Sequence, residues 1–375
     1  MLAGALVLLG ACGGGDGDTA SGPSAADRLT EVERATAATL KSFPSAEGRT
    51  LQEVADRLDP GPQVALATEA YTPGRNRLGF GLLDAENRFV YGPAAVYVGT
   101  SPDARALGPF AATADSLITD PPFRSRNQAA EDDRFASIYA TDVPFGRPGR
   151  WEVLVATRLG GKLLGNTAAV RVVRKERDPV PAIGERAPVV ETETVSSAAG
   201  DMESIETRVP ADDMHDVSFS EVVGRKPVAL LFASPALCES RVCGPVVDIA
   251  AQLQKKYGDR IEFIHQEPYV DNDPNKGFRP PLRSFGVHTE PWLFTTGRDG
   301  RVAARLEGSF GLATFDRAVQ AALRSLGATQ HPSPRHASAP SWTATAAISK
   351  ATSGSSHHSP STAFPSRPTS RAPAR

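Results

Sequence analysis

The sequence has few cysteines, almost no net charge and no long apolar run. Its three cysteines among 375 residues, Cys12, Cys238 and Cys243, allow at most one disulfide within the chain. The net charge of −2 at pH 7 gives no electrostatic reason to expect a nucleic acid as partner. No apolar stretch reaches the roughly 18 residues of a membrane-spanning helix. The remaining composition, 40% hydrophobic and 22% charged, is that of an ordinary globular protein, and the length suits about two domains with extensions.

The first twelve residues, MLAGALVLLGAC, form a short apolar run that ends at a cysteine. The sequence Leu9-Gly10-Ala11-Cys12 resembles the lipobox of bacterial lipoproteins. This resemblance implies a signal peptide over residues 1–12, cleaved before Cys12, and a lipid on the Cys12 thiol. A short secretory signal with an incidental cysteine is the alternative. We expect an extracytoplasmic protein that is lipid-anchored to the cell membrane.

Residues 13–48 begin with GGGDGDTASG and are predicted to be a flexible tether, since glycine and serine give linkers that do not pack. Residues 49–178 then contain short apolar or alternating runs separated by turn residues, which predicts an all-β sandwich of the immunoglobulin-like kind. We interpret residues 100–134, which are polar and contain proline, as a loop. Because residues 49–178 contain no cysteine or histidine, a binding or spacer role is favoured there over catalysis.

Residues 179–327 have a different pattern, in which strands and helices alternate. Apolar runs at 227–234 and 261–266 predict buried strands, and residues 245–257 and 314–326 predict amphipathic helices. An Asp-Gly pair within GRDG predicts a hairpin turn between two later strands. Residues 328–375 contain Ser, Pro, Ala and Thr with no acidic residue, so they are predicted to be a disordered tail.

Three features of residues 179–327 resemble the thioredoxin-like family. They are the strand–cysteine–helix order, the segment Thr289-Glu290-Pro291-Trp292 and the closing hairpin and helix. The resemblance implies an α/β thioredoxin-like domain in which the peptide bond before Pro291 is cis and Pro291 faces the cysteine pair. It also makes Glu290 and His288 candidates for moving protons beside the cysteines.

The cysteine pair departs from the CxxC motif of that family, because ALCESRVCGPV has four residues between Cys238 and Cys243. Two side chains five residues apart on one helix differ by about 140° in direction, so they cannot approach closely enough for a disulfide. We therefore expect Cys238 in the loop before a helix and Cys243 at the start of that helix. A thiolate at this position is stabilised by the unpaired backbone N–H groups.

Three functions remain open at this point. The first is a thiol–disulfide oxidoreductase acting on protein thiols or disulfides, in which Cys238 attacks, Cys243 resolves and Pro291 presents backbone to the substrate. The second is a non-catalytic binding lipoprotein with a structural disulfide. The third is a copper-handling chaperone that adds His265 or His288 to the two thiolates. For the first function, which is favoured, no cofactor and no metal ligand are expected.

Overall fold

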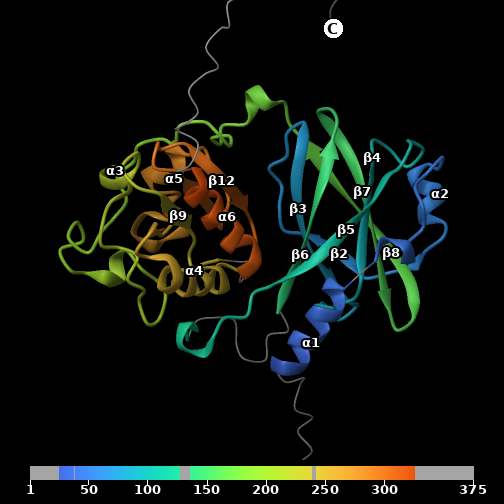
Figure 1. Ribbon diagram of the computed structural model, residues 1–375, viewed down its shortest axis with the longest axis horizontal. Coiled ribbons are helices and arrows are strands. Elements are labelled where there is room, and N and C mark those ends of the chain that lie inside the picture. Colours follow the sequence, from blue (N-terminus) through green and yellow to red (C-terminus); the bar gives the residue numbers. More distant parts are fainter. Residues whose placement is uncertain (1–24, 38, 127–135, 239–241, 326–375) are drawn as a thin grey trace, which may run out of the picture. The chain divides into compact units, whose positions relative to one another are not determined.

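The computed structural model describes residues 25–37, 39–126, 136–238 and 242–325 (Figure 1). The predicted lipidation at Cys12 and the predicted tail at 328–375 lie outside these residues. None of the helices in the described ranges is both long and apolar enough to cross a membrane.

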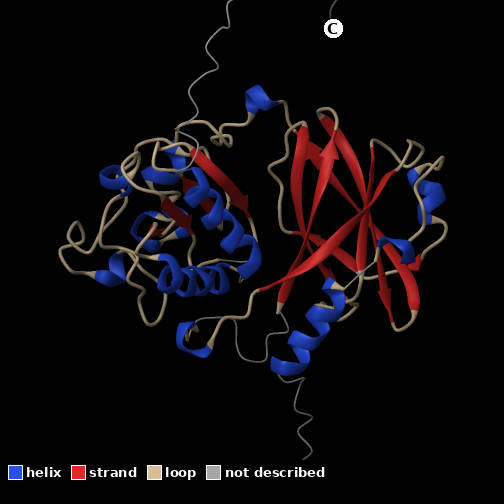
Figure 2. Ribbon diagram, viewed as in Figure 1, coloured by secondary structure: helices blue, strands red, loops and turns tan. Residues whose placement is uncertain are grey.

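The first half of the chain forms an eight-stranded sheet in the order β1-β8-β7-β4-β5-β6-β3-β2. Strands are drawn in red in Figure 2. Neighbouring strands are antiparallel except for β1 and β8, which are parallel. Alternate side chains of these strands enclose one core that contains buried aromatic residues. The strands are β1 (Asp59–Pro60), β2 (Gln63–Leu66), β3 (Gly74–Leu83), β4 (Ala94–Gly99), β5 (Leu107–Ser116), β6 (Ser137–Phe145), β7 (Gly149–Leu159) and β8 (Lys162–Val172).

This architecture confirms a β-rich first half, while the immunoglobulin-like arrangement stays a prediction. The interpretation of residues 100–134 as a loop is wrong, because β5 lies within them. The first part of β5 pairs with β4 and its last four residues pair with β6. Its buried residues include the small Ala112 and Ala114, so the alternation that marks a strand is hard to recognise in the sequence.

Two helices precede or join this sheet. Helix α1 (Ala25–Thr36) buries Val32 and Ala35 in the same core, so the tether prediction is wrong for this part of residues 13–48. Helix α2 (Leu51–Ala55) begins with a capping box, in which Thr50 and Glu53 each accept the other's backbone N–H. The 3-10 helices are η1 (Leu40–Ser42), η2 (Pro121–Phe123), η3 (Lys175–Arg177), η4 (Met202–Ser204), η5 (Val270–Asn272) and η6 (Pro274–Lys276).

The second half contains a four-stranded sheet in the order β10-β9-β11-β12. Strands β9 (Val228–Phe232) and β10 (Glu262–Gln266) are parallel, and helix α4 (Cys243–Tyr257) makes the crossover that parallel strands require. Strands β11 (Trp292–Thr296) and β12 (Val302–Glu307) form an antiparallel hairpin, and β11 also pairs with β9. The predicted succession of strand, helix, strand, hairpin and helix is confirmed.

Both faces of this sheet are covered, because its strands alternate between two cores. Ala229 and Leu231 of β9 pack in a core with α4 and α6 (Leu312–Arg324), whereas Leu230 and Phe232 pack on the opposite face. That second core includes residues of the short helices α3 (Phe219–Val222) and α5 (Pro280–Ser284). The sheet is therefore packed on both faces at the point where β9 ends and the cysteine segment begins.

Helix α4 begins at Cys243, two residues before the predicted start at Pro245. Pro245 is the third helical residue, where a missing N–H still costs no helical hydrogen bond because the first four N–H groups have no partner within a helix.

Two carboxylate side chains, one from each sheet, accept hydrogen bonds from backbone N–H groups in the other half of the chain. Both carboxylate oxygens of Asp115, on β5, accept hydrogen bonds from backbone N–H groups at the start of α6, at 3.0–3.1 Å from Gly311, Ala313 and Thr314. The carboxylate of Glu307, at the end of β12, accepts from the backbone N–H groups of Glu69 and Ala70. The start of α6 is therefore held by a residue of the first sheet.

Candidate redox site and a buried histidine–carboxylate cluster

Cys238 and Cys243 form a disulfide with a Cα–Cα distance of 6.0 Å, within the usual range. Cys238 lies in the loop after β9, and Cys243 is the first residue of α4. The predicted pairing and the predicted placement on either side of the helix start are both confirmed. Residues 239–241, between the two cysteines, lie outside the described residues.

The two sulfur-bearing residues differ in accessibility. Cys243 is fully buried and packs in the core beneath α4, whereas Cys238 is only partly buried at the edge of that core. A second thiol approaching from solvent therefore reaches Cys238 before Cys243.

Glu290 places a carboxyl group against this disulfide. One of its oxygens, Oε2, lies 3.6 Å from Cys243 Sγ and accepts a hydrogen bond of 2.6 Å from the backbone N–H of Ser234. Burial raises the pKa of Glu290 to about 7, although hydrogen bonds from Tyr269 and from Ser234 act in the opposite direction. Glu290 can therefore hold or release a proton near neutral pH beside a sulfur atom.

The peptide bond between Glu290 and Pro291 is cis, as the resemblance implied. Strand β11 starts directly afterwards, and Trp292 pairs with Phe232 at the end of β9. The end of β9 leads into the cysteine loop, so this register brings Glu290 to the same edge of the sheet as the cysteines.

A cavity of about 870 Å³ opens beside this edge. Its lining includes Val242, next to Cys243, together with His288, Glu290 and Trp292. The cavity is large enough to admit side chains of another polypeptide.

The two histidines considered as partners of the cysteines do not serve in that way. His288 is exposed, and both ring nitrogens of His265 already have partners, with Nε2 donating to the Ala233 carbonyl at 2.8 Å. Among the described residues, the group of potential ligands that contains both sulfurs has Glu290 as its third member. Within the described part of the chain, the histidine that the copper-handling alternative requires is therefore not beside the two sulfurs.

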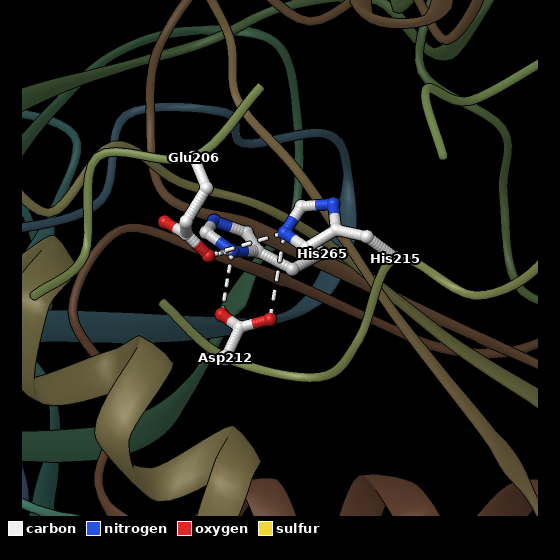
Figure 3. A group of neighbouring side chains, drawn as sticks. All are labelled: Glu206, Asp212, His215 and His265. Atoms are coloured by element: carbon white, nitrogen blue, oxygen red, sulfur yellow. Dashed lines mark hydrogen bonds and ion pairs between the residues drawn. The ribbon is translucent and has the colours of Figure 1, made fainter. Parts of the chain in front are cut away.

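His265 instead belongs to a buried cluster with Glu206, Asp212 and His215 (Figure 3). All four side chains are at most 1% exposed. Glu206, Asp212 and His215 come from the segment between η4 and α3, whereas His265 is on β10. From the sequence, we considered His265 as a possible partner of the cysteines and did not single out the other three residues. Residues separated by about fifty positions show no ligand-like spacing in the local sequence.

The charges in this cluster are strongly coupled. Burial alone would lower the pKa of His265, but the carboxylates of Glu206 and Asp212 outweigh it and hold that pKa well above its usual value. Burial raises the pKa of Asp212, while the two histidines overcome the same effect at Glu206 and lower its pKa. The burial of the two carboxyl groups is therefore stabilised by the positive charge that lies between them.

Helix α4 is fixed on its inner face by a second buried ion pair. Asp248 accepts from Arg208 Nε at 2.9 Å and from the backbone N–H of Ser125 at 3.0 Å. The same arginine donates to the carbonyl oxygens of Phe123 and Pro210. This network anchors the helix that begins with Cys243.

No protein-family model and no curated protein matches the chain. Several solved structures show partial similarity, including the three that follow. A putative thiol:disulfide interchange protein DsbE from Chlorobium tepidum has 18% identity and a TM-score of 0.27, over 38% of this chain and 99% of its own. A thioredoxin-family thiol:disulfide interchange protein from Chlorobium tepidum TLS has 20% identity with the same coverage and TM-score. The endo-beta-1,4-mannanase from Thermotoga petrophila has 12% identity and a TM-score of 0.18, over 32% of this chain and 22% of its own. At TM-scores this low, the chemistry has to be inferred from the residues of the chain itself.

Proposed function

We propose that this chain is a thiol–disulfide oxidoreductase of the thioredoxin-like kind, which exchanges its Cys238–Cys243 disulfide with protein thiols or disulfides. The observation that carries the proposal is the contact between the Glu290 carboxyl group and Cys243 at the start of α4. A purely structural disulfide has no need of a buried acid with a pKa of about 7 beside it.

The proposal includes a location outside the cytoplasm and a lipid anchor on Cys12, because an oxidising compartment is where such a disulfide persists. This part depends on the sequence Leu9-Gly10-Ala11-Cys12 alone.

The reaction is reversible exchange through a mixed disulfide. When the chain acts as oxidant, a substrate thiolate attacks Cys238 Sγ, a new S–S bond forms, and the electron pair of the old bond passes to Cys243 Sγ. Glu290 in its acid form gives that sulfur a proton and regains one from solvent. A second substrate thiolate then attacks the substrate sulfur of the mixed disulfide and releases Cys238, which takes a proton from solvent. The substrate leaves as a disulfide and the chain as a dithiol.

The same groups serve the reverse direction. The Glu290 carboxylate accepts the proton of the Cys243 thiol, and the helix N-terminus stabilises the thiolate that resolves the mixed disulfide. Pro291, beside Glu290, is proposed as a positioning residue at the surface where the substrate polypeptide binds.

Trapping of the mixed disulfide tests the proposal. In a full-length Cys12→Ser background, reduced protein carrying Cys243→Ser is mixed with oxidised glutathione, and the adduct is measured by mass spectrometry. We expect a stable glutathione adduct on Cys238, whereas the chain with both Cys238 and Cys243 returns to its internal disulfide. The matched variant Cys238→Ser should react roughly tenfold more slowly, since the remaining thiol is buried.

The reduction potential of the Cys238–Cys243 couple is the measurement that can contradict the oxidoreductase proposal. A potential far below about −300 mV, together with no turnover of a disulfide substrate, would identify a structural bond and leave the binding-lipoprotein alternative.

A further inference from the structure

We propose that Glu206, Asp212, His215 and His265 form a closed, four-coordinate Zn²⁺ site. The four residues offer two imidazole nitrogens and two carboxylate oxygens within 4.8 Å of one another. This site is separate from the disulfide and goes beyond the proposed redox function.

The separations between neighbouring donor groups, 2.9–3.4 Å, are close to the edges of a zinc tetrahedron and mostly somewhat shorter. Zinc–nitrogen and zinc–oxygen bonds of about 2.0–2.2 Å place neighbouring donors about 3.3–3.6 Å apart. Here Glu206 Oε2 lies 3.1 Å from both His215 Nε2 and His265 Nδ1. Asp212 approaches the two rings with different oxygens, Oδ2 at 2.9 Å from His265 Nδ1 and Oδ1 at 3.4 Å from His215 Nε2, and only one of these oxygens would be the donor. Small outward movements of the donors would make room for the ion.

The orientation of the His265 ring is that of a metal ligand. Its Nε2 donates to the backbone carbonyl of Ala233 at 2.8 Å, so Nδ1 is directed at the two carboxyl groups. A hydrogen bond from the outer ring nitrogen to a backbone carbonyl is the usual support for a metal-bound histidine, because it fixes the tautomer and the ring plane.

Both carboxyl groups have similar outer support. Glu206 Oε1 accepts from the backbone N–H of Arg208 at 2.6 Å, which leaves Oε2 facing the two rings. Asp212 Oδ1 accepts from the backbone N–H of Met214 at 2.9 Å, and Oδ2 faces His265. Three of the four donors are therefore held in place by main-chain groups.

A divalent cation can balance the charge of this cluster, as a protonated His265 does when no metal is bound. Two carboxylates at most 1% exposed are costly to bury unless positive charge accompanies them. The guanidinium of Arg208, in the same segment, is paired with Asp248 and does not serve this purpose. One Zn²⁺ with two neutral histidines and two carboxylates has no net charge.

The chemistry of the donors selects the class of metal. Imidazole with carboxylate suits Zn²⁺, whereas Cu(I) prefers sulfur, and the four donors include none. Because protein groups fill all four positions, the ion would be structural. It would join the segment at 206–215 to β10 and, through Ala233, to the end of β9 that leads to Cys238.

A metal titration of the full-length protein tests the site without relying on variants. The disulfide-intact chain is treated with EDTA, dialysed, and titrated with Zn²⁺ by calorimetry and with Co²⁺ by absorption spectroscopy. We expect one ion per chain and the intense visible bands of tetrahedral Co²⁺, without a thiolate-to-cobalt charge-transfer band. Absence of binding, or the weak spectrum of octahedral Co²⁺, would overturn the proposal.

Variants then locate the ion. His215→Gln and Asp212→Asn should each weaken Zn²⁺ binding by at least about 100-fold, since loss of a direct ligand exceeds the effect of losing an outer hydrogen bond. His288→Gln, which changes an exposed histidine, is the matched control and should bind as tightly as the natural chain. The double variant Cys238→Ser and Cys243→Ser should also retain the ion. Unchanged affinity in a folded His215→Gln chain, or loss of the ion in the double cysteine variant, would refute the assignment and leave the redox proposal untouched.

Discussion

At the scale of single residues, Glu290 is the buried acid of the candidate redox site. Its carboxyl group contacts Cys243 and the backbone of Ser234, and its pKa of about 7 lies far above the ordinary value of 4.5. Folding therefore favours the neutral acid. As pH rises from about 4.5 to about 7, the folded chain keeps this proton longer than the unfolded chain does, so the contribution of Glu290 to stability is present at low pH and lost over that interval.

The variant Glu290→Gln should remove this pH dependence. Glutamine keeps an oxygen for the Ser234 N–H but has no proton to lose. Between about pH 4.5 and about pH 8, we expect the free energy of unfolding of the oxidised chain to fall more for the natural protein than for the variant. Urea unfolding at several pH values measures the difference, with His288→Gln as a control that alters an exposed neighbour. Parallel pH profiles for Glu290→Gln and the natural chain would show that the buried acid does not titrate as proposed.

Some residues of the candidate site are predictable from sequence and others are not. The cysteine pair and the proline follow from local patterns, since a helix start and a residue before a buried strand can be recognised within a few positions. The histidine–carboxylate cluster cannot be found in this way. His215 lies in an irregular segment and His265 in a strand, and only the folded sheet brings the two rings to the same carboxyl groups.

At the scale of elements, α4 is the helix on which the candidate redox site depends. It begins with Cys243 and is fixed one turn later by Asp248, whose carboxylate is fully buried against Arg208 and Ser125. Loss of this carboxylate would leave a buried guanidinium without its charge partner, which is far more costly than loss of a surface ion pair.

The variant Asp248→Ala should accordingly lower the free energy of unfolding by about 3–5 kcal/mol. Chemical denaturation measures this value. Asp259→Ala, an exposed aspartate just beyond the end of α4, is the matched control and should change stability by less than about 0.5 kcal/mol. A similar small effect of Asp248→Ala would mean that the buried pair does not stabilise the helix.

The elements themselves were predictable where their apolar periodicity is strong. Strands β9 and β10 and helices α4 and α6 match their predicted positions within about two residues, because each buries a regular set of large side chains. Strand β5 was missed since small and polar residues occupy much of it, and α1 was missed because its glycine-rich approach resembles a linker. Pairing with β4 and β6 determines β5, and packing of Val32 and Ala35 in the core determines α1; neither contact is visible in the local sequence.

At the scale of the whole molecule, the first sheet supplies a cap to the last helix. Asp115 on β5 receives three N–H groups from the start of α6, and its residue is only 6% exposed. A carboxylate at a helix N-terminus satisfies unpaired N–H groups and is favoured by the helix dipole. The cap that usually comes from the adjacent sequence comes here from a residue nearly two hundred positions earlier.

Replacement of Asp115 by alanine should therefore lower the free energy of unfolding by roughly 1–3 kcal/mol, since three buried donors lose their acceptor. Asp115→Asn should be milder because one carbonyl oxygen remains. Asp142→Ala on the neighbouring strand β6, where the side chain is 56% exposed, is the control. Hydrogen exchange of the first amides of α6 distinguishes loss of the cap from general destabilisation, and unchanged exchange there would contradict the assignment.

The same contact has a consequence for dissecting the protein by truncation. A fragment that starts after residue 178 would contain both cysteines, Glu290 and the histidine–carboxylate cluster, so it would hold every residue of the two candidate sites. It would lack Asp115, however, and the backbone N–H groups at the start of α6 would have to donate hydrogen bonds to water instead. Thiol–disulfide exchange rates measured on such a fragment would be those of a protein with a destabilised α6. The boundary suggested by the change in sequence pattern is therefore a poor place to truncate the chain.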